Sequence, residues 1–189
     1  MKAEGFDVVI VGAGPAGMFA CFELLEAEPN IKIALVEMGP RLEDRSPSQV
    51  MSGFGGAGTY SDGKLHYTPK LSHERALHLI SESAYFEILQ SIEDRFKRYG
   101  VVADTYPRNP EEVQAMIEEA EKCDIELIVR KAQHVGTDRL RKVIQRFQDD
   151  LISRGVALLD RTKIEDIIIE PKISGALDES GNRILGKHV

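Results

Sequence analysis

The pattern of apolar and polar positions predicts a βαβ unit at the start of the chain. The apolar runs FDVVIV (6–11) and IKIALVE (31–37) are typical of central parallel strands that are covered on both faces. Residues 15–28, rich in Ala, Phe and Leu, are typical of a helix that ends before Pro29. Strand, turn, helix and strand together occupy about the 30 residues of such a unit.

Helical periodicity returns after residue 70 and gives way to strands near the end. Residues 72–99 and 110–122 combine helical spacing with many charges, and IELIV (125–129) has the composition of a strand. VALLD, KIEDIIIE and the remaining residues predict strands, with a turn at DESGN between the last two. A further helix is predicted at 137–154, where one face carries the apolar residues Leu140, Val143, Ile144, Phe147 and Leu151.

Composition and charge exclude several function classes. With 42% hydrophobic and 29% charged residues, the 189-residue chain has the composition of an ordinary soluble globular protein. Its net charge of −7 argues against nucleic-acid binding, because nothing would offset phosphate repulsion. We expect no transmembrane segment, because no apolar run approaches the ~20 residues that span a bilayer. Since the start shows no signal-peptide pattern, we expect a cytoplasmic protein.

The cysteines predict neither a metal site nor a reactive thiol. Cys21 and Cys123 are far apart in sequence and lack a metal-ligand spacing, so two reduced thiols are expected. Cys21 lies between Ala20 and Phe22 in a predicted helix, which indicates packing. No Ser/His/Asp arrangement emerges from the other residues, so the catalytic residues stay unassigned.

A glycine motif joins the first predicted strand to the first predicted helix. Gly12, Gly14 and Gly17 form G-x-G-x-x-G directly between them, which is the context that the motif requires. Gly12 allows the tight turn, Gly14 lets a pyrophosphate approach the backbone, and Gly17 lets the helix pack closely on the sheet. The helix N-terminus offers N–H groups and partial positive charge to a diphosphate. Pro15 fits the first helical position, where an N–H has no intrahelical partner.

An acidic residue stands where a dinucleotide site needs one. Glu37 ends the second predicted strand, about 20 residues after the last glycine of the motif. A carboxylate there can accept hydrogen bonds from the ribose hydroxyls of an adenosine. The sequence therefore predicts a dinucleotide-binding site. The motif reads the adenosine diphosphate part that NAD and FAD share, so it leaves the choice between them open.

A second glycine-rich stretch, MSGFGGAGTYSDGKL (51–65), lacks the context of such a turn. It follows no predicted strand and leads into no predicted helix. Phe54, Tyr60 and Leu65 are interleaved with its glycines, unlike the composition of a flexible linker. Glycines here would let the backbone pass close to a flat or bulky ligand. We expect the stretch to return along the same edge of the sheet, with its amides near the far half of an extended dinucleotide.

Taken together, VVIVGAGPAG, ALVEMG and MSGFGGAGTYSDGKL resemble the N-terminal part of flavoproteins of the glutathione-reductase superfamily. The resemblance is to a family of uncharacterised FAD-utilising dehydrogenases, and more distantly to the fumarate-reductase, p-hydroxybenzoate-hydroxylase and geranylgeranyl-reductase groups. HVGTDRL and VALLDRTKIEDIIIE also fit this pattern. It implies an α/β, Rossmann-like FAD/NAD(P)-binding domain with a parallel sheet, a helical insertion and a C-terminal β-meander. It also implies a flavin-dependent oxidoreductase or dehydrogenase that binds FAD, with NAD(P) as a candidate electron partner.

The resemblance further implies roles toward FAD for individual residues. The pyrophosphate would lie on the first glycine turn, the ribose at Glu37 and the adenine against the backbone of 162–164. Arg41 or Arg45 would reach the ribityl-phosphate side, and Lys64 would stabilise the anionic reduced flavin. The implied cofactor-binding residues are Gly12, Ala13, Gly14, Pro15, Ala16, Gly17, Glu37, Met38, Arg45, Gly55, Gly56, Ala57, Lys64, Lys163 and Ile164.

Plainer interpretations stand beside these roles. Arg41, Arg45 and Lys64 can be solvated loop charges, and SDG (61–63) is an ordinary turn sequence. His134 is more often a loop residue with a local partner than a ligand-binding group. Two other functions also fit the first motif. An NAD-dependent dehydrogenase leaves residues 51–65 unexplained, and a non-catalytic dinucleotide-binding fragment would keep the first motif only.

The chain departs from the superfamily pattern near its end. The resemblance implies a late Gly-Asp motif that binds the ribityl chain, and the 189 residues contain no Gly-Asp dipeptide. We therefore expect the N-terminal part of a longer protein, whose C-terminal part supplies the site for a small-molecule substrate. The expected division is a FAD-binding domain at 1–68 and 131–189, with the helical insertion at 69–130. A sheet strand left at an edge predicts weak or absent FAD binding and self-association.

Overall fold

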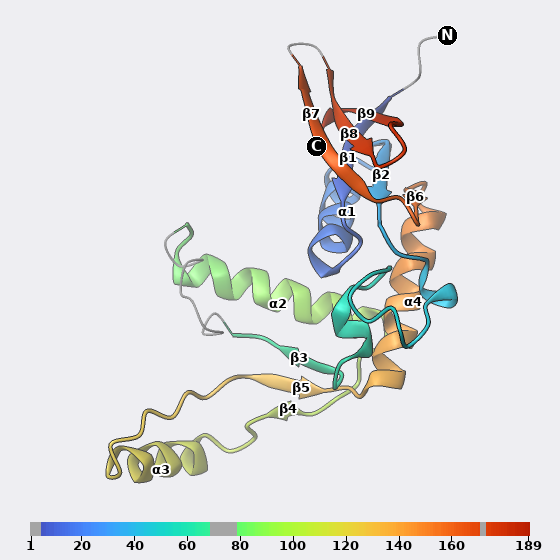
Figure 1. Ribbon diagram of the computed structural model, residues 1–189. Helices are drawn as coiled ribbons and strands as arrows, with labels where there is room; N and C mark the ends of the chain where they lie inside the picture. The colour runs from blue at the N-terminus through green and yellow to red at the C-terminus, as the bar shows by residue number, and fades with distance from the viewer. Residues whose placement is uncertain (1–4, 69–78, 171–172) are drawn as a thin grey trace. The chain divides into compact units, whose positions relative to one another are not determined.

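A computed structural model describes residues 5–68, 79–170 and 173–189. The chain divides into two compact units, one of Met1–Ser61 with Ile144–Val189 and the other of Asp62–Val143 (Figure 1). The first unit contains the predicted βαβ segment and the C-terminal strands. The second contains most of the charged middle of the sequence.

The first unit is built on a six-stranded mixed sheet. Its strand order is β6-β2-β1-β9-β8-β7, and the pairings β6–β2, β2–β1 and β1–β9 are parallel. Strands β7, β8 and β9 pair antiparallel and form the C-terminal meander (Figure 1). The predicted α/β fold with a parallel sheet is therefore confirmed. The strands are β1 (Phe6–Val11), β2 (Ile33–Val36), β6 (Ala157–Leu159), β7 (Ile164–Glu170), β8 (Ile173–Asp178) and β9 (Arg183–His188).

Helix α1 (Pro15–Ala27) covers one face of the parallel strands. A Cβ at Gly17 would lie 1.9 Å from the carbonyl oxygen of Gly12 and 3.3 Å from the side chain of Ile10, so only glycine lets the helix approach this closely. Phe22 of α1 packs edge-on against Phe147 of α4 (Thr137–Ser153), with ring centroids 5.3 Å apart. Both rings are buried, so these two helices share one core.

The other face of the sheet holds a separate apolar cluster. Val9, Ala34 and Val36 from β1 and β2 meet Ala176 of β8 there, all of them essentially without solvent exposure. Val9 and Ala34 are direct partners in the β1–β2 register, so their side chains share a face. The nearly unbroken apolar runs of the sequence follow from this arrangement, because both faces of the central strands are covered.

The second unit contains a three-stranded antiparallel sheet and two helices. Its strand order is β3-β5-β4, formed by β3 (Lys64–His66), β5 (Ala132–His134) and β4 (Thr105–Tyr106). Helix α2 (Glu82–Arg98) begins after Ser81, whose hydroxyl accepts a hydrogen bond from the amide of Ala84. Helix α3 (Pro110–Glu121) lies at the end of the long excursion between β4 and β5 (Figure 1).

One face of this small sheet is joined to α2 through a buried carboxylate. Gln133 of β5 donates from its side-chain amide to Glu93 of α2 at 3.3 Å, and Lys131 donates to the same carboxylate at 2.6 Å. Lys97 adds an ion pair at 3.0 Å. Burial alone would raise the pKa of Glu93, but the two ammonium groups outweigh it and hold the pKa below its usual value.

The prediction of a strand at 125–129 is wrong. Asp124 takes a left-handed conformation (φ 57°), and the amide of Ile125 donates to the carbonyl of Ala120 at 3.0 Å, which is the pattern of a helix C-cap. The apolar run therefore follows the C-cap of α3 without forming a strand, and Ile125 and Ile128 are exposed. The helix predicted at 72–99 is observed only from Glu82, and residues 72–78 lie outside the described part.

Within the described ranges, no helix is both long and apolar enough to cross a membrane. The expected domain boundaries at residues 69 and 130 and the expected self-association stay predictions.

Candidate dinucleotide-binding site

The head of α1 lies at the carboxyl end of β1. Gly14 is the N-cap residue (φ −74°, ψ −176°), and no side chain caps the helix. The first bond of the helix runs from the amide of Met18 to the carbonyl of Gly14. The amides of Ala16 and Gly17 precede that bond and therefore have no intrahelical acceptor. Ala16 is exposed, so this end of the helix is open to solvent.

The three glycines of the motif differ in what surrounds them. Ideal Cβ atoms at Gly12 (φ +100°) and Gly14 would meet no heavy atom within 4 Å, whereas one at Gly17 would overlap the carbonyl oxygen of Gly12. Gly17 is thus required for packing, and Gly12 by its backbone conformation. At Gly14 the protein leaves open space where a side chain would be. Such a glycine-capped helix head at the carboxyl end of a parallel strand is the geometry that dinucleotide-binding domains use.

Glu37 joins three segments around this turn. Its buried carboxylate accepts hydrogen bonds from the amide of Ala13 at 2.9 Å on Oε2, and from the amides of Gly39 at 2.9 Å and Gly53 at 2.8 Å on Oε1. The acid thus lies beside the glycine turn, as the sequence predicted. It also has a structural role that the sequence did not reveal, because it ties the turn to residue 53 in the second glycine-rich stretch.

The second glycine-rich stretch packs directly against the first. The amide of Gly55 donates to the carbonyl of Ala13 at 2.8 Å. A Cβ at Gly56 (φ +69°) would lie 3.3 Å from the Cα of Gly14 and 3.3 Å from Pro15. A short 3₁₀ helix, Ala57–Tyr60, follows. The segment 55–57, which the resemblance implied as cofactor-binding, therefore packs against the head of α1 through its first two residues.

Arg45 holds this loop in place. Its buried guanidinium donates to the carbonyls of Phe54 at 2.8 Å and Gly56 at 2.9 Å through Nη1, and to those of Gln49 and Val50 through Nη2. It also stacks on the ring of Tyr60, 4.7 Å from its centroid. These contacts shape the glycine-rich backbone. The predicted contact of Arg45 with FAD stays a prediction.

The remaining predicted residues of the first unit lie around Glu37. The amide of Thr162 donates to the carbonyl of Glu37 at 2.9 Å, which places Lys163 and Ile164, at the start of β7, close to Glu37. Met38 is 56% exposed. The guanidinium of Arg41 forms an ion pair with the carboxylate of Asp160 at 3.0 Å.

Lys64 belongs to the second unit, on β3. It forms an ion pair with Asp62 at 2.8 Å, and this hydrogen bond lowers the pKa of the Asp62 carboxyl group. His134 is its direct partner across β3 and β5. Within the described residues, no group of three His, Cys, Asp or Glu side chains lies close enough together to hold a metal ion.

Comparison with known proteins gives a fold and no family. No family model matches the sequence, and no curated protein matches it. Solved structures do match. NikD, an unusual amino acid oxidase of nikkomycin biosynthesis, superimposes with a TM-score of 0.54 at 12% identity, over 98% of this chain and 50% of that one. Glycine oxidase from Geobacillus kaustophilus gives 0.54 at 16% identity, over 96% and 53%.

A third match is L-proline dehydrogenase from P. horikoshii, with a TM-score of 0.53 at 15% identity over 98% of this chain and 51% of that one. At these identities the likeness shows the fold: a mixed α/β domain with a parallel sheet, helices and C-terminal antiparallel strands. The chain spans about half the length of these three proteins.

Proposed function

We propose that this chain is the FAD-binding portion of a flavin-dependent oxidoreductase. The observation that carries the proposal is the head of α1: free helical amides, an N-cap glycine without a capping side chain, and open space where a Cβ of Gly14 would be. These residues fit a pyrophosphate, because phosphate oxygens need donors and room to approach the backbone.

Glu37 would hold the adenosine ribose. Within the described part of the chain its Oε2 receives one amide hydrogen bond, and a carboxylate oxygen can accept at least two. A ribose hydroxyl can therefore add to Oε2 without displacing Ala13. Met38 follows Glu37 in the chain, and the amide of Thr162 is bonded to the Glu37 carbonyl. Met38 and the backbone of 162–164 would therefore flank the adenosine.

The packed glycine-rich stretch supports FAD over NAD. Gly55 and Gly56 extend the backbone surface beyond the first turn, and Arg45 and Glu37 fix that extension through buried hydrogen bonds. An NAD site needs only the first motif and leaves this second surface unused, whereas the larger flavin-bearing half of FAD would use it. Gly55, Gly56 and Ala57 would therefore lie along the flavin-bearing half of the cofactor.

The bound flavin would supply the redox chemistry, and the protein would supply binding and orientation. The amides of Ala16 and Gly17 would donate hydrogen bonds to the pyrophosphate oxygens. Gly55 and Gly56, held by Arg45, would fix the direction in which the cofactor leaves the helix head. The substrate site and NAD(P) as electron partner belong to the same proposal and rest on the sequence resemblance. The cytoplasmic location stays a prediction.

Absorption spectroscopy tests the proposal. The longest native open reading frame that contains this sequence is expressed, and its spectrum is recorded as purified and after addition of FAD. We expect flavin bands that remain after gel filtration. A protein that lacks these bands and binds no FAD on titration contradicts the proposal; retention of NAD instead favours a nicotinamide-dependent dehydrogenase.

A further inference from the structure

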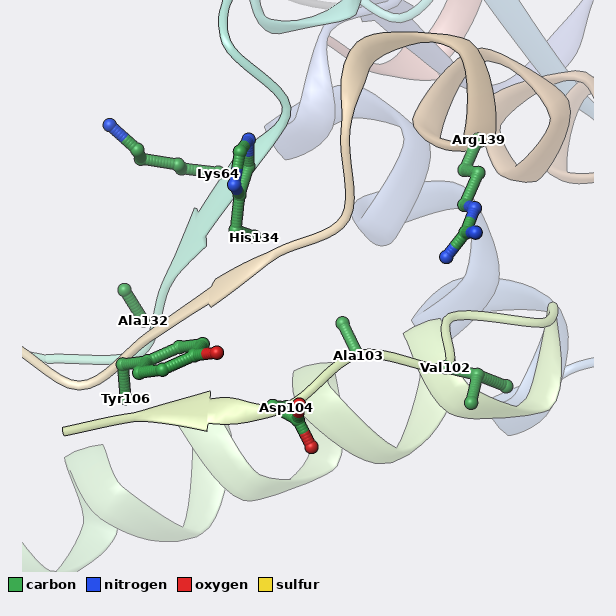
Figure 2. Close-up of a pocket in the computed structure, with 8 residues that line it drawn as sticks. All are labelled: Lys64, Val102, Ala103, Asp104, Tyr106, Ala132, His134 and Arg139. Carbon is green, nitrogen blue, oxygen red and sulfur yellow. The ribbon is translucent and has the colours of Figure 1, made fainter. Parts of the chain in front are cut away.

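The excursion between β4 and β5 ends in a lobe that has no core of its own. The excursion starts after Tyr106 and returns at Ala132, which pair across β4 and β5 and line the open pocket in Figure 2. We call residues 107–130 the α3 lobe, after the helix at its end (Figure 1). None of these residues is buried. An isolated helix of 12 residues is marginal in water, so α3 needs something to pack against.

The α3 lobe presents apolar side chains to solvent. One stripe of the helix has the i, i+3, i+4, i+7 spacing that places side chains on one face, and it consists of Val113, Met116, Ile117 and Ala120. Met116 is 62% exposed. The amide of Ile125 donates to the carbonyl of Ala120, so the apolar segment 125–128 starts where the stripe ends. Ile125 and Ile128 are 57% and 52% exposed.

The same lobe is strongly acidic. Residues 109–128 contain seven carboxylates and one basic residue, Lys122, which pairs with Glu119 at 3.3 Å. All seven carboxylate residues are exposed. Six of them have no basic partner among the residues that the structure describes: Glu111, Glu112, Glu118, Glu121, Asp124 and Glu126.

The carboxylates border the apolar stripe on both sides. Each residue turns a helix by about 100°, so Glu112 and Glu119 fall on one border of the stripe and Glu121 on the other. An apolar strip between two acidic borders is the complement of an amphipathic helix whose apolar face lies between basic side chains.

Charge decides between the candidate occupants of this surface. A second copy of the lobe would bring carboxylates against carboxylates, and the phosphates of a nucleic acid or an anionic membrane would be repelled in the same way. A cationic helix is attracted instead. Its apolar face would remove the exposed parts of Met116, Ile125 and Ile128 from water.

We infer that the α3 lobe docks a basic amphipathic helix of another protein. The apolar face of that helix lies along the stripe, and its Lys and Arg side chains lie against Glu112, Glu119 and Glu121. The lobe belongs to the second unit, whereas the turn that would hold FAD belongs to the first. The docking surface is therefore independent of the proposed cofactor site.

Peptide titrations of the isotope-labelled 189-residue protein test the inference, with amide chemical shifts as the measurement. The probe is a synthetic helical peptide of Leu and Lys that carries every Leu on one face. One control peptide has the same composition in scrambled order, and another has Glu in place of every Lys. We expect the probe to shift the signals of Met116, Ile125 and Ile128 and to bind at least about tenfold more tightly than the scrambled peptide. The acidic peptide should not bind, and added salt should weaken binding of the probe.

Two matched variants test the apolar contact. Ile128→Ser should weaken binding of the probe at least about threefold, because it removes apolar surface that the peptide covers. Ile88→Ser makes the same change on α2, where Ile88 is 49% exposed, and should leave the affinity unchanged. Thermal melting of both variants shows that they are folded.

Equal affinity for the probe and the scrambled peptide overturns the inference, because charge alone then explains the binding. Equal loss in the two variants, or shifts confined to residues outside the α3 lobe, also overturns it. A dimer that Ile128→Ser dissociates would assign the lobe to a second copy. A probe that binds the 189-residue protein but not the longest native open reading frame would assign it to the rest of the same polypeptide. Both results overturn the inference, and none of these outcomes depends on FAD, so failure here leaves the proposed cofactor site standing.

Discussion

The amide of Gly55 donates a 2.8 Å hydrogen bond to the carbonyl of Ala13. Two glycine-rich stretches that lie far apart in sequence thereby form one continuous backbone surface at the head of α1. Glu37 closes the arrangement from the other side by binding the amides of Ala13 and Gly53. This three-way junction is the physical basis of the proposed cofactor site, and it gives each of its residues a distinct, measurable role.

Gly14→Val should abolish cofactor retention without unfolding the protein. The backbone at Gly14 is extended, and its Cβ direction is empty, so the variant should melt like wild type. The added side chain fills the space of the pyrophosphate, and FAD affinity should fall at least about tenfold.

The matched variant Gly17→Ala should behave in the opposite way and lower stability, by roughly 1–3 kcal/mol, because its Cβ overlaps the carbonyl of Gly12. Melting curves and flavin fluorescence titrations separate the two effects. Full FAD retention by Gly14→Val removes this turn from the site.

Glu37→Gln should weaken both the fold and cofactor binding. Three backbone amides donate to this carboxylate, and the side-chain NH₂ of glutamine cannot accept from any of them. One amide is left unsatisfied, at a cost of about 1–3 kcal/mol. Glu28→Gln makes the same charge change at an exposed carboxylate and is the control. Urea unfolding that gives the same stability for both variants would contradict the structural role of Glu37.

The stability of the second unit should depend on the charge of Glu93. The pKa of Glu93 is lowered in the folded state. Its contribution to the free energy of unfolding is therefore fully present above the pKa of the unfolded chain, about 4.3, and is lost as the pH falls through the pKa of the folded state. Glu93→Gln should cost about 1–3 kcal/mol near pH 7. The gap to wild type should close on acidification. Chemical unfolding across this range gives the measurement, and a pH-independent gap would show that the ion pairs with Lys97 and Lys131 do not stabilise the fold.

The two thiols should differ sharply in reactivity. Burial raises the pKa of the Cys21 thiol to about 12, whereas Cys123 is exposed. Since the thiolate is the reactive form, a disulfide reagent at mildly alkaline pH should label Cys123 quickly and Cys21 only after denaturation. Cys123→Ser should remove the fast reaction. Rapid labelling of Cys21 in the native protein would mean that the core between α1 and the sheet opens readily.

The parts of the fold that were predictable from the sequence are those with a long apolar signal. β1, α1, α3, α4 and the C-terminal strands follow runs or periodic faces of several residues, and their bounds agree with the structure to within a few residues. β3 and β4 have only three and two residues, too few for any periodicity. IELIV was mistaken for a strand because it has the composition of one, whereas in the structure the amide of Ile125 takes part in the C-cap of α3.

The first glycine turn and the acid beside it were predictable from the sequence, whereas the contacts that hold the second glycine-rich stretch were not. Gly12, Gly14 and Gly17 have a spacing that geometry explains, and the acid beside them follows from the length of a βαβ unit. The bonds of Arg45 to loop carbonyls could not be inferred, because an arginine in a loop is usually solvated. Lys64 and His134 come together only through the pairing of β3 with β5, which no local pattern encodes.

The most direct test of the central claim is a titration of the isotope-labelled 189-residue protein with ADP, followed by amide chemical shifts. ADP carries the part of the cofactor that the helix head and Glu37 would bind, so weak binding still gives a readable signal. The account predicts that the largest shifts occur at Ala13, Gly14, Ala16, Gly17 and Gly39, and that they disappear in Gly14→Val. Shifts confined to other residues, or shifts at the helix head that persist unchanged in Gly14→Val, would contradict it.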